Sequence, residues 1–172
     1  MEIKKYVVTG GPGCGKTTIL NLLQGRGYGI VPEAARVVLR ENPAMVGLDL
    51  QKAIVSKQIE LESRVNGGSV SAFLDRGILD NKAYADYFGC GFIDNYKDVV
   101  SKANYQTKVF YLKPLSREFY QNDSERRESY EEAVKIGEKI QNTYLEHGYN
   151  VIALDPSTPE DRLEKIIIEV EK

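Results

Sequence analysis

The stretch that decides the fold is Gly10-Gly11-Pro12-Gly13-Cys14-Gly15-Lys16-Thr17, which has the pattern G-x-x-x-x-G-K-T. An apolar, β-branched run over residues 3–9 precedes it, and apolar residues at helical spacing follow it up to residue 24. A strand before this pattern and a helix after it form the context of a phosphate-binding P-loop. The glycines let backbone N–H groups surround a phosphate, and the helix N-terminus adds a favourable dipole.

This loop predicts a nucleotide site for ATP, with GTP as the alternative, together with Mg²⁺. Lys16 would contact the β- and γ-phosphates, and the Thr17 hydroxyl would bind Mg²⁺. The residues expected to contact the phosphates are Gly11, Pro12, Gly13, Cys14, Gly15, Lys16, Thr17 and Thr18.

Length and composition predict one domain over residues 1–172. Hydrophobic residues make up 42% of the chain and charged residues 28%, which is typical of a soluble globular protein. The net charge of −2 gives no reason to expect nucleic acid or a membrane surface as a partner. Charged residues after Met1 leave no room for a signal peptide, and no apolar run reaches the roughly 18 residues of a membrane span. Cys14 and Cys90 lack metal-ligand spacing, so we expect a reduced cytoplasmic protein, either a monomer or a homodimer.

Strand and helix patterns alternate along the chain. Strands are expected over residues 3–9, 28–31, 70–74, 109–112 and 151–154, and helices over 15–24, 33–40, 50–65, 79–88, 94–105 and 130–146. Gly67-Gly68 would end the third helix, while Thr158 and Pro159 would begin a last one. This alternation predicts parallel strands with right-handed crossovers, and therefore a three-layer α/β fold whose site lies beyond the carboxyl ends of the strands.

The dipeptide Asp75-Arg76 follows the apolar strand over 70–74. An Asp at this point of a P-loop protein is expected in the Mg²⁺ shell, and the alternative is a cap for the next helix. Many P-loop ATPases carry a Glu after this Asp to activate water, whereas Arg76 is a cation and cannot act as a base. We expect Arg76 to grip an anionic substrate or a phosphate, which favours transfer to a bound acceptor over hydrolysis. The alternative is a salt bridge to an acid at a strand end.

Glu33 and Arg36 lie where the second strand gives way to a helix. A carboxylate at this position can accept the proton of a hydroxyl nucleophile, although Glu is also favoured in the first turn of any helix. Arg36 lies three residues on, so it shares a helix face with Glu33. It would orient Glu33 or bind substrate, or it would form a salt bridge that only steadies the helix.

A polar segment over residues 114–130 is a candidate lid, and its cationic side chains are Arg117, Arg126 and Arg127. Closed over the phosphates, such a lid would neutralise developing charge. The alternative is a solvated loop whose cations offset neighbouring acids. The helix over 79–88 carries Asp80 and Tyr84, which would line an acceptor pocket unless the tyrosine belongs to the core. His147, at the end of a helix, needs no catalytic role.

The segments T-G-G-P-G-C-G-K-T-T, V-P-E-A-A-R and F-L-D-R-G-I-L-D-N-K-A-Y together resemble one family, and the resemblance covers nearly the whole chain. It is the family of AAA-domain-labelled, predicted ATPase/kinase P-loop proteins, which is similar to the ribosylnicotinamide kinase domain and, more distantly, to thymidylate and deoxynucleoside kinases. The resemblance implies the sheet order 2-3-1-4-5. It also implies that Glu33 is the base for an acceptor hydroxyl, that Arg76 belongs to the acid–Arg pair after strand three, and that Arg162 contacts the adenine ring. The acceptor region over 45–66 and 79–104 matches no acceptor-specific pattern.

The leading interpretation is therefore a small-molecule kinase that moves the ATP γ-phosphate to a nucleoside-like or nucleotide-like acceptor. Its expected catalytic residues are Lys16, Glu33, Asp75, Arg76 and Arg126; its expected substrate residues are Glu33, Arg36, Arg76, Asp80 and Tyr84. The alternatives are an ATPase and an ATP- or GTP-dependent regulatory protein. A GTPase is disfavoured, because Asn81-Lys82-Ala83 continues with Tyr84 instead of the Asp of N-K-x-D.

Overall fold

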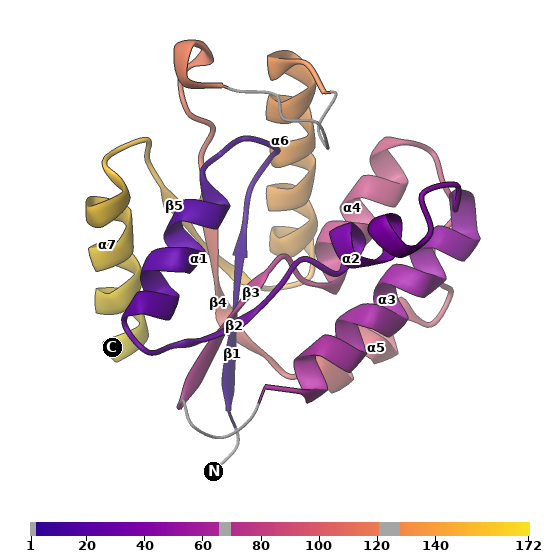
Figure 1. The fold of residues 1–172 in the computed structure, drawn as a ribbon, viewed down its shortest axis with the longest axis horizontal. Helices are drawn as coiled ribbons and strands as arrows, with labels where there is room; N and C mark the ends of the chain where they lie inside the picture. The colour runs from indigo at the N-terminus through magenta and orange to yellow at the C-terminus, as the bar shows by residue number, and fades with distance from the viewer. Residues whose placement is uncertain (1–2, 66–69, 121–127) are drawn as a thin grey trace.

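A computed structural model describes residues 3–65, 70–120 and 128–172. The strands are β1 (Lys4–Thr9), β2 (Gly29–Val31), β3 (Ser71–Asp75), β4 (Tyr105–Leu112) and β5 (Asn150–Leu154). The helices are α1 (Lys16–Gly25), α2 (Ala34–Glu41), α3 (Gly47–Ser63), α4 (Ile78–Tyr87), α5 (Tyr96–Ala103), α6 (Tyr130–Glu146) and α7 (Pro159–Glu171), with a short 3₁₀ helix η1 (Arg117–Phe119) after β4. Figure 1 shows these elements along the chain.

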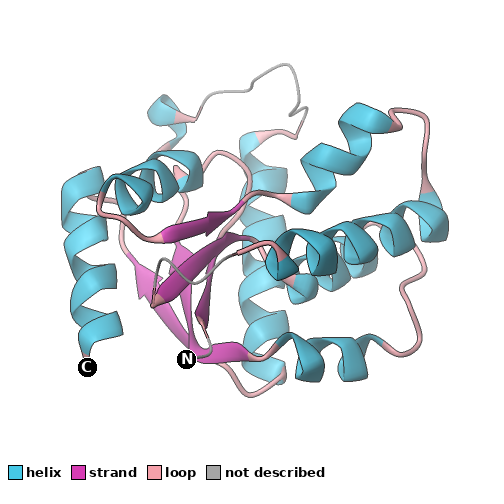
Figure 2. Cartoon of the chain, turned by 60° about the horizontal axis from the view of Figure 1, so that its bottom comes forward, coloured by secondary structure: helices cyan, strands magenta, loops and turns pink. Residues whose placement is uncertain are grey.

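The five strands form one parallel sheet in the order β2-β3-β1-β4-β5, as predicted. Helices cover both faces of the sheet (Figures 1 and 2), which confirms the three-layer α/β class. Side chains of β1 alternate between the two faces: Val8 packs with α1 and α7, whereas Val7 packs with residues of α4 and α6. Both faces are apolar because each is covered by helices, as parallel sheets require.

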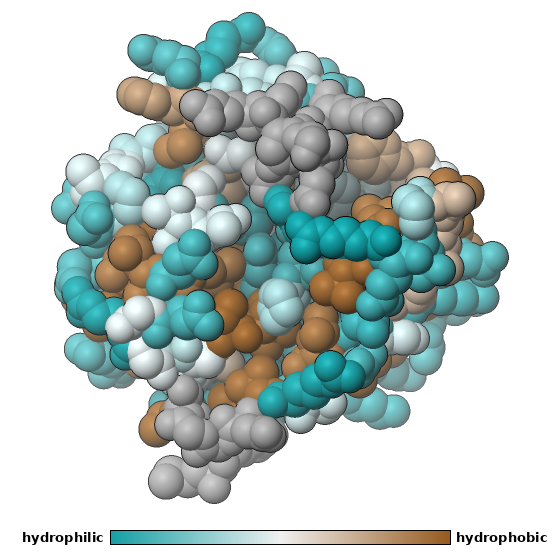
Figure 3. Space-filling view, viewed as in Figure 1, coloured by the Kyte–Doolittle hydropathy of each residue, from teal (hydrophilic) through white to brown (hydrophobic). Residues whose placement is uncertain are grey.

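The surface of the molecule carries both hydrophilic and hydrophobic side chains. Figure 3 shows hydrophilic and hydrophobic residues interspersed over the face that is viewed in Figure 1. Among the described residues, no helix is both long enough and apolar enough to cross a membrane.

Two element boundaries differ from the prediction by three residues or more. Strand β4 begins at Tyr105, whereas the sequence predicted a strand only from residue 109 and a helix up to residue 105. Asn104 adopts a left-handed conformation (φ 53°) that ends α5, and Tyr105 then pairs with Lys5 of β1. Helix α3 begins at Gly47, before the predicted start at residue 50, and no side chain caps its start. The predicted stop at Gly67-Gly68 lies outside the described residues.

The phosphate loop packs directly on helix α6 through glycine. An ideal Cβ on Gly11 would lie 2.3 Å from the Ala133 carbonyl oxygen. On the other side of the contact, an ideal Cβ on Gly137 would lie 2.8 Å from the Tyr111 hydroxyl and 3.2 Å from the Gly11 nitrogen. The absence of side chains at Gly11 and Gly137 thus lets the loop and the helix approach backbone to backbone, and this contact fixes the height of the loop above the sheet.

This contact predicts that Gly137→Ala destabilises the protein by about 1–3 kcal/mol, because overpacking outweighs the gain in helix propensity. The measurement is the free energy of unfolding from urea titration. Gly25→Ala is the matched control, since Gly25 also lies in a helix but has no atom within 4 Å of its ideal Cβ. We expect the control to be neutral or more stable by about 0.5–1 kcal/mol. Equal midpoints for the two variants would contradict this account.

Candidate functional site

The loop between β1 and α1 has the shape of an anion site. Gly13 and Gly15 adopt left-handed conformations, with φ of 70° and 90°, and α1 begins immediately afterwards at Lys16. The N–H groups of the first helical turn therefore point outward and have no partners within the helix. The Lys16 side chain is buried at 3% exposure, whereas Thr17 and Thr18 are exposed. A phosphate bound here would meet backbone donors, a helix dipole and one ammonium group.

The next two strand ends place further charges beside this loop. Glu33 is the residue before α2, and its carboxylate accepts hydrogen bonds from Arg36 (3.0 Å) and Arg76 (3.3 Å). The carboxylate makes no capping bond to the helix, so capping does not explain its position. Burial acts to raise the pKa of Glu33, but the charges of Arg76, Lys16 and Arg36 outweigh it, and the pKa is lowered. Glu33 is therefore an ionised acceptor at neutral pH.

Asp75 is the last residue of β3 and has the opposite electrostatic character. Its Oδ1 atom is buried and has no hydrogen-bond partner. Burial raises the pKa of Asp75, and the nearby positive charge of Lys16 compensates only in part. An orphaned carboxylate oxygen beside an anion-binding loop fits a bound cation.

The chemistry of these residues fits Mg²⁺ that arrives with a nucleotide. Mg²⁺ prefers oxygen ligands, and Thr17 and Asp75 offer a hydroxyl and a carboxylate. The described part of the chain contains no group of three or more His, Cys, Asp or Glu side chains that would hold a metal without help. A cation here would therefore depend on phosphate oxygens and water for its remaining ligands.

Arg76 lies at the centre of a buried network of hydrogen bonds and ion pairs. The sequence analysis gave a salt bridge of this kind as the alternative to substrate binding. Its guanidinium donates to Glu33, to the Gly10 carbonyl oxygen (3.1 Å), to Asp80 (3.0 Å) and to the Tyr84 hydroxyl (3.2 Å). The residue is 5% exposed and has a positive φ of 72°. Substrate contact by Arg76 stays a prediction, since its donors are occupied within the protein.

Asp80 requires a correction, because the sequence predicted a substrate contact. It is completely buried. Its carboxylate accepts hydrogen bonds from Arg76, from the Gly77 amide (2.9 Å), and from the hydroxyls of Thr9 and Tyr144. Asp80 therefore lies beneath the site and joins β1, α4 and α6. Tyr84 lies nearer the surface, where its ring packs under Arg76 and stacks on Phe88.

The candidate lid is described only in part. Arg117 lies on η1, where it pairs with Glu131 and covers the ring of Tyr130; its side chain is 71% exposed. Arg126 and Arg127 lie outside the described residues. Tyr120 was not predicted: its ring would lie 2.6 Å from an ideal Cβ on Gly13, so it packs on the phosphate loop. No motif marks this tyrosine in the sequence, because the contact depends on the path of the chain after β4.

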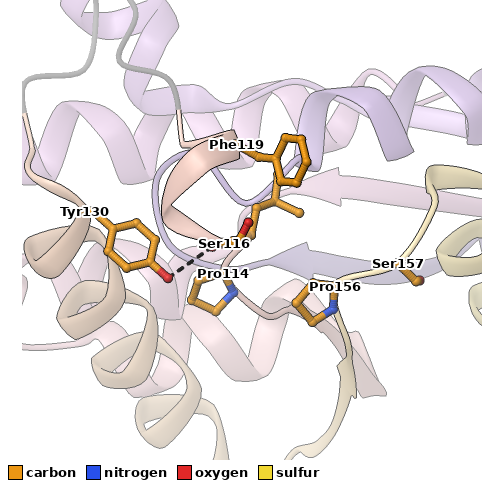
Figure 4. A pocket seen from close by; sticks show the side chains of 7 residues that line it. Pro114, Ser116, Phe119, Tyr130, Pro156 and Ser157 are labelled. Atoms are coloured by element: carbon orange, nitrogen blue, oxygen red, sulfur yellow. Dashed lines mark hydrogen bonds between the residues drawn. The ribbon is translucent and has the colours of Figure 1, made fainter.

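A cavity of about 470 Å³ opens between the loops that follow β4 and β5 (Figure 4). Its lining residues are Pro114, Leu115, Ser116, Phe119, Tyr130, Pro156 and Ser157. Figure 4 shows Tyr130 at the left, Phe119 at the top, and Pro114 and Pro156 next to each other below. The cavity lies beyond the carboxyl ends of two strands, at the same edge of the sheet as the phosphate loop, which is where ligands of such sheets bind.

The contacts of Arg162 also differ from those expected. The sequence analysis implied an adenine contact, but Arg162 is 2% exposed and donates to three backbone carbonyls, those of Cys14, Lys113 and Asp155. A base contact by this residue stays a prediction without support in the geometry. A second cavity of about 410 Å³ lies between α5, the start of β4 and the end of α6, at the opposite edge of the sheet.

Comparison with known proteins agrees with this geometry. A family model described as AAA domain matches residues 5–162. NadR protein in complex with NR has a TM-score of 0.75 and 18% identity; the match covers 98% of this chain and 51% of NadR, so the chain spans about half of that protein. Deoxyadenosine kinase from M. mycoides with bound dATP has a TM-score of 0.62 and 16% identity, with 98% and 100% of the two chains covered. Thymidylate kinase from Candida albicans has a TM-score of 0.65 and 14% identity, with 98% and 91% covered. These similarities show the fold, and no curated protein matches the sequence.

The buried state of Asp75 generates a prediction about pH. Burial raises the pKa of Asp75 in the folded protein, so folding favours the protonated carboxyl. The pKa of this carboxyl in the unfolded chain is about 3.9. As the pH rises above that value, the unfolded chain loses its proton first, and the folded protein becomes less stable relative to it. Asp75→Asn should therefore be more stable than the wild type at pH 7, and this difference should shrink as the pH is lowered towards 4. Urea titrations at several pH values, without nucleotide or Mg²⁺, provide the measurement.

Asp155→Asn is the matched control, because exposed Lys113 lowers the pKa of Asp155. Its effect has the opposite sign: the wild-type carboxylate is slightly favourable at neutral pH and loses that contribution as pH falls. A gain for Asp75→Asn that does not change with pH would contradict the assignment of Asp75 as a buried carboxyl with a raised pKa.

Proposed function

We propose that this chain, which belongs to the family described as AAA domain, is a phosphotransferase that moves the γ-phosphate of Mg-ATP to a small nucleoside-like or nucleotide-like acceptor. The observation that carries the proposal is the position of ionised Glu33 between Arg36 and Arg76, with Lys16 of the phosphate loop close enough to lower its pKa. This arrangement supports the assignment of Glu33 as the proton acceptor beside the end of the phosphate site. Kinases named among the similar structures support the same reaction class.

On the donor side, the phosphate loop would hold the triphosphate and the 470 Å³ cavity would hold the base. Backbone N–H groups of Gly11 and of residues 13–18 would surround the phosphates, and Lys16 would contact the β- and γ-phosphates. Thr17 and Asp75 would hold Mg²⁺, which neutralises phosphate charge when bound. Besides Ser116 and Ser157, the cavity walls are proline, leucine and aromatic rings, which suit the flat faces of a base. Apolar walls do not distinguish adenine from guanine, and the hydroxyls of Ser116 and Ser157 can each donate or accept, so GTP is the second donor to test.

On the acceptor side, Glu33 would accept the proton from the acceptor hydroxyl as its oxygen attacks the γ-phosphorus. The bond between the γ-phosphorus and the bridging oxygen breaks, and the nucleoside diphosphate leaves with that oxygen. The lowered pKa of Glu33 keeps it ionised and available for the proton. If the acceptor is a phosphate, its oxygen attacks in the same way and needs no base.

Cations would stabilise the charge that develops on the transferred group. Lys16 lies within the phosphate loop, and Arg117, Arg126 and Arg127 are the lid residues that would approach from above. Arg36 and Tyr84 flank Glu33 and Arg76 and would contact the acceptor. The residue beside Asp75 is the cation Arg76, so this site lacks the water-activating acid at that position, and transfer is favoured over hydrolysis. A cytoplasmic location and a monomeric or homodimeric state remain predictions.

A ligand screen tests the proposed function. Thermal shifts would be measured with Mg²⁺, a non-hydrolysable ATP analogue and a panel of nucleosides, nucleotides and nicotinamide riboside. The analogue should raise the melting temperature, and one acceptor class should raise it further, because ligands that bind the folded state stabilise it by mass action. The hit would then be incubated with ATP and the product identified by mass spectrometry. Stabilisation by the ATP analogue without transfer to any acceptor would favour the regulatory alternative.

Glu33→Gln tests the proposed base. Gln keeps the size of the side chain but cannot take a proton, so transfer to a hydroxyl acceptor should fall about 10²–10⁴-fold while affinity for Mg-ADP changes little. Initial rates and calorimetric titration of Mg-ADP provide the two measurements. Glu164→Gln is the control, because Glu164 forms only an exposed pair with Arg26. Unchanged turnover in Glu33→Gln would remove Glu33 from the role of base.

A further inference from the structure

Arg162 is a buried cation whose partners are all backbone carbonyls. Its Nε donates to the Asp155 oxygen (2.9 Å), one terminal nitrogen to the Cys14 oxygen (2.8 Å) and the other to the Lys113 oxygen (2.9 Å). No carboxylate in the part of the chain that the structure describes forms an ion pair with it, and burial lowers its pKa. Burying a charge costs desolvation free energy, which the hydrogen bonds of the guanidinium must offset.

The three carbonyls belong to the three segments of the proposed nucleotide site. Cys14 lies in the phosphate loop. Lys113 precedes Pro114 and Asp155 precedes Pro156, and both prolines line the 470 Å³ cavity (Figure 4). The guanidinium therefore joins both loops of the cavity to the loop that would hold the phosphates.

Arg162 is itself held in one orientation. It lies in the first turn of α7, where the Thr158 hydroxyl accepts a hydrogen bond from the Asp161 amide (3.2 Å). The next residue, Leu163, is 3% exposed and anchors the helix to the sheet. The planar fork of an arginine reaches three acceptors in fixed directions, which an ammonium group on a flexible stem cannot reproduce.

From these contacts we infer that Arg162 is a positioning residue that couples the cavity to the phosphate loop, so that the base and the phosphates of a nucleotide bind cooperatively. The inference rests on the proposed function, which puts the base in the cavity and the phosphates in the loop. Arg162 acts through the backbone of three segments and does not touch the nucleotide.

The test compares Mg-ADP with Mg-pyrophosphate, which carries the same two phosphates but no nucleoside. Calorimetric titrations would use the wild type, Arg162→Lys and Arg162→Met at a temperature well below each melting point. In the wild type, the ratio of the pyrophosphate Kd to the ADP Kd measures the contribution of the nucleoside, because the two ligands carry the same number of phosphates. That ratio should fall about tenfold in both variants, which corresponds to a coupling free energy of about 1.4 kcal/mol. Arg26→Met is the control, since Arg26 reaches α7 only through an exposed pair with Glu164 and should keep the wild-type ratio.

Each outcome decides one point. If Arg162→Lys keeps the wild-type ratio, positive charge alone is enough to couple the two parts of the site. If both variants keep it, Arg162 only stabilises the fold. Either result overturns the inference. Failure of the wild type to bind Mg-ADP would instead overturn the proposed function. If Arg162→Met does not fold, the lysine variant carries the test. Hydrogen exchange of the peptides over 10–18 and 113–117, without ligand, should then be faster in Arg162→Lys than in the wild type, and equal exchange would overturn the coupling.

Discussion

The buried ion pair between Arg76 and Asp80 is the interaction on which the geometry of the site depends. Its atoms are 3.0 Å apart, and the two side chains are 6% and 0% exposed, so neither charge has water as an alternative partner. Removing one member of such a pair typically costs about 3–5 kcal/mol. Asp80 accepts hydrogen bonds from Thr9 at the end of β1 and from Tyr144 of α6. Arg76 donates to Glu33 and to the Gly10 carbonyl oxygen. The left-handed conformation of Arg76, which is unfavourable for a residue with a side chain, is tolerated because these partners hold it.

That network also explains why two neighbouring carboxylates behave differently. Glu33 faces the guanidinium groups of Arg36 and Arg76 directly, so it stays ionised. Asp75 has a buried oxygen without a donor, and its charge becomes favourable only when a cation is near. Environments that push the pKa values of two acids apart commonly separate their roles. Here the separation fits a proton acceptor at Glu33 and a metal ligand at Asp75.

Local sequence signals predicted the strands and helices well. Most errors concerned side chains whose contacts join segments far apart in the chain. Helix α6 begins and ends where predicted, because Ser129 and Glu132 form a capping box and its apolar stripe is regular. The sheet order followed from family resemblance. Asp80 was expected to line an acceptor pocket, although its spacing of four residues from Arg76 is also a signal for an ion pair. The contacts of Arg162 and Tyr120 join segments far apart in the chain, and no local pattern encodes them.

The placement of the two cysteines gives the molecule a built-in chemical reporter. Cys14 lies inside the phosphate loop with 1% of its surface exposed, whereas Cys90, after α4, is half-buried. A thiol-modifying reagent can reach Cys14 only when the loop leaves its packed position against α6 and β4. The rate at which the second thiol becomes labelled, after Cys90 has reacted, therefore measures how often the loop opens. Local unfolding of the phosphate loop can in this way be followed in the wild-type protein, without any substitution.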